Sequence, residues 1–176
     1  MIVKVEKLTS MSAFKDADAE LLSMKLDAIE NLIRSYTNNN FQNRAMRLDS
    51  VAVENGLIVG HSPYFKVGDT IQISQSGVND GLYVISAITD TTIAIGSDLY
   101  DNALNTVTKV IYPGDVQKGV IDLMVWEQEN RSKVGIQSET ISRHSVTYFN
   151  QDSSNQVMGY PVSLLGFLKP YIKARF

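Results

Sequence analysis

Apolar residues recur at three- and four-residue spacing along residues 16–36, and polar residues fill the positions between them. This spacing gathers the apolar side chains on one face of a helix. Asp16, Asp18 and Glu20 suit the positive N-terminal end of that helix, and a polar run at residues 37–40 supplies its end. The pattern therefore predicts an amphipathic helix, with an apolar face made of Leu22, Leu26, Ile29, Ile33 and Tyr36.

From about Val51 to Val110 the apolar positions alternate with a period of two, which is typical of strands. Asn55-Gly56 lies between two short apolar runs, and this dipeptide is a strong hairpin signal because both residues tolerate a positive φ. The predicted strands cover residues 51–53, 57–59, 70–74, 82–88, 92–95 and 107–111. Short strands at this spacing predict a small antiparallel barrel or sandwich.

Helical spacing returns after Pro113-Gly114, where Asp115 is a natural N-cap for a helix that reaches about Asn130. The middle of this helix is apolar on nearly every side, so it needs cover on every side. Two sources of cover remain open: a neighbouring subunit, or a central position beneath the β segment. The apolar residues concerned are Val120, Ile121, Leu123, Met124, Val125 and Trp126.

The last third of the chain predicts an extended segment around residues 141–149 and a short helix from Tyr160 to Lys169. Pro161 fits the first helical turn, and Pro170 is expected to stop the helix because its ring disfavours the α conformation of the preceding residue. Residues 170–176 are expected to leave as an extended peptide. This tail is too apolar to be left free, so we expect it to dock on a partner or on the chain itself.

Together these patterns predict an α+β fold. Its expected architecture is a split helical frame, with two long helices and a short C-terminal helix, that carries an inserted small antiparallel β barrel or sandwich. The predicted domains are a helical frame of residues 1–49 and 113–176 and an inserted β domain of residues 50–112.

Composition narrows the classes of function. The chain has 176 residues and no cysteine, which excludes disulfides, thiolate nucleophiles and cysteine-bound zinc. It has no apolar run near the 18–20 residues that a membrane span needs and no pattern of a signal peptide, so no membrane partner and synthesis in the cytoplasm are expected. From Arg131 onward six basic residues face two acidic ones, although the net charge of the chain is −3. This asymmetry indicates an oriented partner or an uneven solvated surface.

Catalytic motifs are missing from the sequence. Its two histidines, His61 and His144, lack carboxylates at metal-ligand spacing, and no phosphate-binding glycine pattern occurs. We therefore expect neither an enzyme nor a cofactor or metal. The β segment carries only Lys66 and Lys109 as basic residues against six acidic ones, so its attraction for phosphate should be weak.

The order of these segments resembles the head-to-tail connector proteins of tailed bacteriophages, also called adaptor or head-completion proteins, in the version with a small β insertion. The residues that carry the resemblance are the opening helix DAELLSMKLDAIENLIRSYTNNNF with Arg44 and Arg47 after it, the β phrase FKVGDTIQISQSGVNDGLYVISAI, the second helix, and SETISRHSVTYF followed by GYPVSLLGFLKPYIKARF.

The resemblance implies a structural protein of the virion, at the interface between head and tail, that assembles in the host bacterial cytoplasm. Copies would form a homo-oligomeric ring, commonly of about twelve subunits, below the phage portal protein. The ring would extend the channel for genomic DNA, without sequence-specific binding, and would provide a platform for a downstream stopper or tail-completion protein.

The resemblance also assigns roles to residues of this chain. Candidates for portal binding are Lys169, Tyr171, Lys173, Arg175 and Phe176. The resemblance also places the stretch 139–149 at subunit contacts, with Arg143, Val146 and Tyr148 as candidates. The apolar surface of the second helix adds Val120, Met124 and Trp126 as candidates for the subunit interface. The alternative interpretation is a β-barrel nucleic-acid-binding module with a helical oligomerisation arm.

Overall fold

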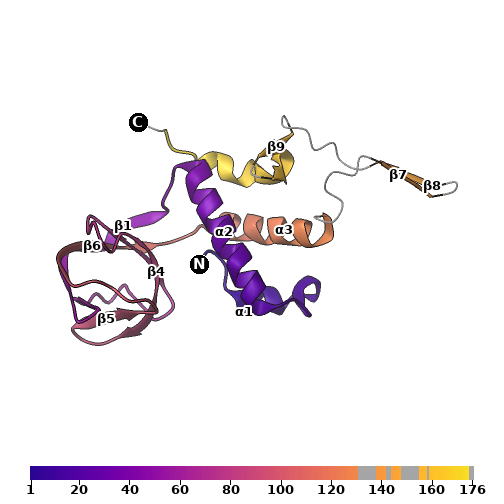
Figure 1. The fold of residues 1–176 in the computed structure, drawn as a ribbon. Coiled ribbons are helices and arrows are strands. Elements are labelled where there is room, and N and C mark those ends of the chain that lie inside the picture. The colour runs from indigo at the N-terminus through magenta and orange to yellow at the C-terminus, as the bar shows by residue number, and fades with distance from the viewer. Residues whose placement is uncertain (131–137, 142–143, 148–154, 158, 175–176) are drawn as a thin grey trace. The chain divides into compact units, whose positions relative to one another are not determined.

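The chain folds into two compact units, and the computed structural model describes residues 1–130, 138–141, 144–147, 155–157 and 159–174 (Figure 1). The first unit, which we call the barrel unit, contains residues 40–112 together with Met1. The second, which we call the helical unit, contains residues 2–39 and 113–176. The helical unit is thus assembled from segments on both sides of the barrel unit in the sequence.

The barrel unit is a closed antiparallel barrel of six strands in the order β1-β2-β5-β4-β3-β6. Pairing of β1 with β6 closes it, with Val53 opposite Asn102 at one end and Gln42 opposite Val110 at the other. The strands are β1 (Gln42–Glu54), β2 (Leu57–Val59), β3 (Thr70–Ser74), β4 (Gly81–Ile88), β5 (Thr92–Ile95) and β6 (Asn102–Val110).

The barrel core consists largely of β-branched side chains that alternate with outward-facing residues, as the two-residue period predicts. The predicted turn at Asn55-Gly56 is confirmed: the two residues have φ values of 52° and 73° and join β1 to β2. Inward-facing members of the core are Val53, Ile58, Phe65, Ile71, Ile73, Ile85, Ile93, Leu99 and Val107.

The helical unit is built around two long helices, α2 (Ala19–Thr37) and α3 (Gly114–Asn130). The predicted first helix is confirmed, and the Asp18 side chain caps it by accepting a hydrogen bond from the Glu20 amide at 2.8 Å. The shorter elements of the unit are α1 (Val5–Thr9), η1 (Ser12–Phe14), β7 (Ser138–Ile141), β8 (His144–Thr147), β9 (Gln156–Val157), β10 (Tyr160–Pro161) and the 3-10 helix η3 (Val162–Tyr171).

Helix α3 receives its cover within its own unit. At Gly119 the ring of Phe167 lies so close that an added Cβ would be 2.5 Å from it, so only glycine permits this approach. Val120 and Met124 are buried in the same core, whereas Ile121 and Val125 are half-buried. Neither a neighbouring subunit nor a position beneath the β segment is needed to explain the buried face of α3.

The predicted fold class, a split helical frame carrying a β insertion, is wrong, because the closed six-stranded barrel dominates the structure. The sequence stretch QNRAMRLDS (residues 42–50) shows no clean alternation, and the predicted helical frame includes all of it except Ser50. The stretch forms the first nine residues of β1. Irregularities in the pairing of β1 with β6, between Asn43 and Arg47 and between Leu48 and Val51, conceal the strand period.

The C-terminal elements also differ from the prediction. The expected helix from Tyr160 to Lys169 is instead the two-residue strand β10 followed by η3, which continues through Pro170. A 3-10 helix bonds each residue to the third before it rather than the fourth, and η3 ends at Tyr171, one residue after Pro170. Of the expected extended segment around residues 141–149, the structure describes Ile141, which ends β7, and β8, which pairs with β7. Residues 142–143 and 148–149 lie outside the described residues.

Candidate functional site

The C-terminal segment, residues 169–174, docks on the C-terminal end of α2 in its own helical unit. The Lys173 amide donates to the Thr37 carbonyl at 2.8 Å. In return, the side-chain amides of Asn38 and Asn39 donate to the carbonyls of Ala174 and Tyr171, at 2.8 Å and 3.1 Å. The segment therefore supplies a partner to a carbonyl at the end of α2, which the helix itself leaves unsatisfied.

Two asparagines make this docking possible. Asn38 adopts the left-handed conformation, with φ 47°, that commonly ends a helix, and asparagine tolerates it better than other residues with a Cβ. Asn39 is buried, so its amide is fixed in the direction of the segment. The sequence showed a polar stop at residues 37–40, but nothing in it indicated that this stop binds the C-terminal segment.

A second anchor joins Tyr171 to the start of α3. Its hydroxyl lies 2.8 Å from both carboxylate oxygens of Asp115 and donates a hydrogen bond to that carboxylate. This hydrogen bond is the main cause of the raised pKa of Tyr171, since ionisation would remove the proton that the phenol donates to Asp115. Asp115 also accepts from the Val116 amide at 2.9 Å, within the first turn of the helix.

The anchored segment presents basic and apolar side chains to solvent. Lys169, Ile172 and Lys173 are exposed, and Tyr171 is half-buried. The structure thus brings together three of the five candidates for portal binding, Lys169, Tyr171 and Lys173. The other two, Arg175 and Phe176, lie outside the described residues.

The candidates for the subunit interface are not brought together. Val120 and Met124 belong to the buried core of the helical unit and offer no surface to a partner. Trp126 is half-buried and packs edge-on against Tyr160, with 5.7 Å between ring centroids. Val146 lies in β8 opposite Glu139 of β7. Arg143 and Tyr148 are outside the described residues.

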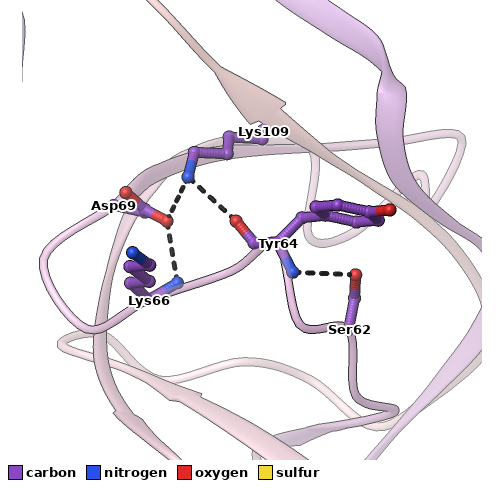
Figure 2. Close-up of polar contacts among 5 residues, drawn as sticks. All are labelled: Ser62, Tyr64, Lys66, Asp69 and Lys109. Atoms are coloured by element: carbon purple, nitrogen blue, oxygen red, sulfur yellow. Dashed lines mark hydrogen bonds and ion pairs between the residues drawn. The ribbon is translucent and has the colours of Figure 1, made fainter.

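The barrel unit contains a polar cluster that sequence reasoning missed (Figure 2). The Lys109 ammonium lies 2.6 Å from an Asp69 carboxylate oxygen and 2.9 Å from the Tyr64 carbonyl, to which it donates. The same Asp69 oxygen accepts from the Lys66 amide at 2.7 Å. Because Lys109 and Asp69 are 40 positions apart in the sequence, no local pattern reveals the pair.

This cluster weakens the electrostatic basis of a nucleic-acid-binding barrel. The Lys109 side chain is only 16% exposed, and its charge is balanced by Asp69. Arg47 is likewise paired, with Asp49 at 2.8 Å. Residues 40–112 carry four basic side chains against seven acidic ones. Attraction to phosphate requires several basic groups on one surface, and this unit offers Arg44 and Lys66.

The described residues contain neither a metal-binding cluster nor a helix that could span a membrane. No group of three or more histidine, cysteine, aspartate or glutamate side chains there is arranged to hold a metal ion. Among those same residues, no helix is both long and apolar enough to cross a membrane. Comparison with known proteins found no matching family model and no matching curated protein.

Proposed function

We propose that this chain is a structural protein of a tailed-bacteriophage virion, a head-to-tail connector. In this proposal, copies form a ring below the portal protein, extend the DNA channel without binding a particular sequence, and provide the docking platform for the next connector or the tail. The protein would be located at the interface between head and tail of the virion and would assemble in the cytoplasm of the host bacterium. No catalytic step is part of the proposal.

The observation that carries the proposal is the presentation of the C-terminal segment. Backbone and asparagine hydrogen bonds fix its path, while Lys169, Ile172 and Lys173 remain exposed. A fixed segment loses less conformational entropy on binding than a free tail. Its basic and apolar side chains match the portal-binding tail that the resemblance assigns to this part of the sequence.

Charge reversal in the segment tests the proposal. The variant Lys169→Glu with Lys173→Glu keeps the backbone hydrogen bond of Lys173 to Thr37 and changes only the exposed charges. We expect it to bind the purified portal ring of the same phage at least about tenfold more weakly than the unchanged protein. Surface plasmon resonance with immobilised portal measures the affinity, and circular dichroism verifies the fold.

A matched control reverses two exposed lysines elsewhere in the helical unit, Lys4→Glu with Lys7→Glu, and should bind the portal normally. Equal loss in both variants, or no loss in the first, would contradict the assigned role of the segment. Deletion of residues 170–176 is a poorer test, because it also removes the hydrogen bonds that Asn38 and Asn39 make with the segment.

The alternative function, nucleic-acid binding by the barrel, is separated from the connector by a second assay. A connector ring should show no tight binding of short single-stranded DNA at about 0.15 M salt. Tight binding by a monomer or dimer, fading steeply as salt rises, would favour the alternative.

A further inference from the structure

One end of the barrel is made rigid by a network of polar side chains that joins its loops. The Asn79 side chain is 2% exposed and makes two hydrogen bonds with the backbone of Tyr100. Its carbonyl oxygen accepts from the Tyr100 amide at 2.9 Å, and its amide group donates to the Tyr100 carbonyl at 2.8 Å. The Asn79 side chain thereby joins loop 76–80 to loop 96–101 with a donor and an acceptor, as the backbone of a neighbouring strand would.

Two more contacts extend this network. The Asn102 side chain donates to the Ser76 carbonyl at 2.7 Å, which fixes the start of β6 against loop 76–80. The Asp101 carboxylate accepts from the Gly56 amide at 3.1 Å and joins the turn between β1 and β2. Three connections of this barrel end therefore form one preorganised surface.

Large apolar side chains project from this surface. Val78, Tyr100 and Leu104 are 60%, 73% and 61% exposed. We call this end of the barrel, with its loops 55–56, 76–80 and 96–101, the acidic end. Such exposed side chains on a rigid support are typical of contact sites, because little entropy is lost when they are buried. The charged residues at this end are all acidic and all exposed: Glu54, Asp80, Asp98 and Asp101.

The opposite end of the barrel has a similar construction and a small excess of basic side chains. Exposed Lys66 and Arg44 lie there with one exposed acid, Asp90, in the turn between β4 and β5, and Lys109 is paired with Asp69. Loop 62–69 carries Tyr64 and Val67, which are 56% and 63% exposed. Figure 2 shows how Ser62 and Lys109 hold the backbone of Tyr64, and how Asp69 holds the Lys66 amide. Lys66 is exposed on this loop. Exposed Arg44 lies near the start of β1, which pairs with the last residues of β6 at this same end.

We propose that the acidic end of one barrel docks on the basic end of the barrel in a second copy of this chain. The chain carries both halves of a complementary pair: a tyrosine and a valine beside carboxylates at one end, and a tyrosine and a valine beside Lys66 and Arg44 at the other. Because the contact joins two different surfaces, a docked pair keeps one free acidic end and one free basic end, so further copies can add. The array closes into a ring where the rotation between copies returns to the first one, and it extends as a filament where it does not.

This inference rests on the proposed function and deepens it, since it gives the barrel a role as the contact between neighbouring subunits of the ring. Opposite charges at the two ends orient the copies and disfavour contacts between like ends. The apolar side chains supply the buried area.

The test uses two variants of the full chain that keep every side chain of the hydrogen-bond networks. The acidic-end variant is Tyr100→Ala with Asp98→Lys, and the basic-end variant is Tyr64→Ala with Lys66→Glu. Native mass spectrometry and light scattering measure the mass of each, alone and mixed in equal amounts. Met24→Ala serves as the control, because Met24 is an exposed apolar residue in α2 of the helical unit and lies in neither barrel end.

We expect the unchanged protein and the control to assemble. Each end variant alone should remain at the monomer mass of 19.5 kDa at concentrations at least about tenfold above those at which the unchanged protein assembles. The equimolar mixture should form a complex of two copies and stop there, because each partner keeps one intact end. Leu104→Ser and Val67→Ser provide a second pair should a double variant fail to fold.

Assembly of the end variants into the same particle as the unchanged protein would overturn the inference while leaving the connector proposal intact, since the ring would then use another surface. A mixture that yields no two-copy complex would also overturn it. An unchanged protein that stays monomeric at all concentrations would overturn it as well, and portal binding by the C-terminal segment would then decide the connector proposal separately.

Discussion

The two ends of the barrel fix the backbone of an exposed tyrosine by different kinds of hydrogen bond. At the acidic end the neutral side-chain amide of Asn79 has both a donor and an acceptor, so it alone binds both the amide and the carbonyl of Tyr100. At the basic end Lys109 can only donate, so Ser62 serves the Tyr64 amide and Asp69 balances the charge. The neutral anchor thus consists of one residue, Asn79. The charged anchor consists of Lys109, Ser62 and Asp69, and its contribution to stability depends on salt concentration.

Removal of Asp69 should have the largest effect on stability. Asp69→Ala leaves the mostly buried Lys109 ammonium without its carboxylate and the Lys66 amide without its acceptor. We expect the free energy of unfolding to fall by about 2–3 kcal/mol, somewhat less than for a fully buried pair. Urea denaturation at low salt measures it.

The double variant Asp69→Ala with Lys109→Met is the control for this experiment. Because it removes the unpaired charge as well, it should recover about half of the loss. A loss below about 0.5 kcal/mol in Asp69→Ala would show that the charged anchor contributes little and would weaken the contrast between the two ends.

Removal of the neutral anchor should come next. Asn79→Ala leaves the amide and the carbonyl of Tyr100 without their partner, at an expected cost of about 1–2 kcal/mol. The decisive comparison is its salt dependence: the loss in Asn79→Ala should be the same in 0.05 M and 1 M salt, and the loss in Asp69→Ala should shrink. Equal salt responses of the two variants would erase the distinction between the anchors.

Much of the fold could be predicted from local sequence patterns. The helix around residues 19–37 and the turn at Asn55-Gly56 follow directly from spacing and turn chemistry, and both are confirmed. The first nine residues of β1 could not be predicted, because the bulges place its residues on the sheet without a regular period. That missed strand is the one that closes the barrel against β6.

The sequence predicts which residue types form the candidate site, but not which distant residues they contact. The sequence predicts that the tail docks, yet the Thr37 carbonyl of α2, which accepts from the Lys173 amide, lies more than 130 positions away in the sequence. In the sequence, Lys109 is one of two basic residues of the β segment, and its partner Asp69 is 40 positions away. Val120 and Met124 looked like interface residues because helical spacing cannot show which side of an apolar helix its own unit will bury.

The asparagine anchor of the C-terminal segment extends the comparison to the helical unit. Asn39→Ala removes the buried donor to the Tyr171 carbonyl and should lower the free energy of unfolding by about 1 kcal/mol. Asn38→Gly is the matched substitution. It loses a hydrogen bond to Ala174 but relieves the left-handed backbone, so its effect should be close to zero. A larger loss for Asn38→Gly than for Asn39→Ala in chemical denaturation would refute this ranking.

The exposed tyrosine anchor should have the smallest effect. Tyr171→Phe removes the hydrogen bond to Asp115, which raises the pKa of Tyr171 above its ordinary value of 10.0. A raised pKa means that the contribution to stability is fully present below pH 10 and disappears as the pH rises through the folded-state pKa. Unfolding at pH 8 should therefore show a small advantage for tyrosine over phenylalanine, and unfolding near pH 11 should show a smaller one or none. An advantage that grows with pH would reverse the assignment.

The docking of residues 171–174 on the end of α2 also imposes an order on how the protein is made. Apart from Met1, the barrel unit is one contiguous stretch, residues 40–112. The barrel can therefore close while later residues are still in the ribosome. Helix α2 is synthesised before the barrel, but the hydrogen bond at its C-terminal end, from the Lys173 amide to the Thr37 carbonyl, forms only after the C-terminal segment has been synthesised.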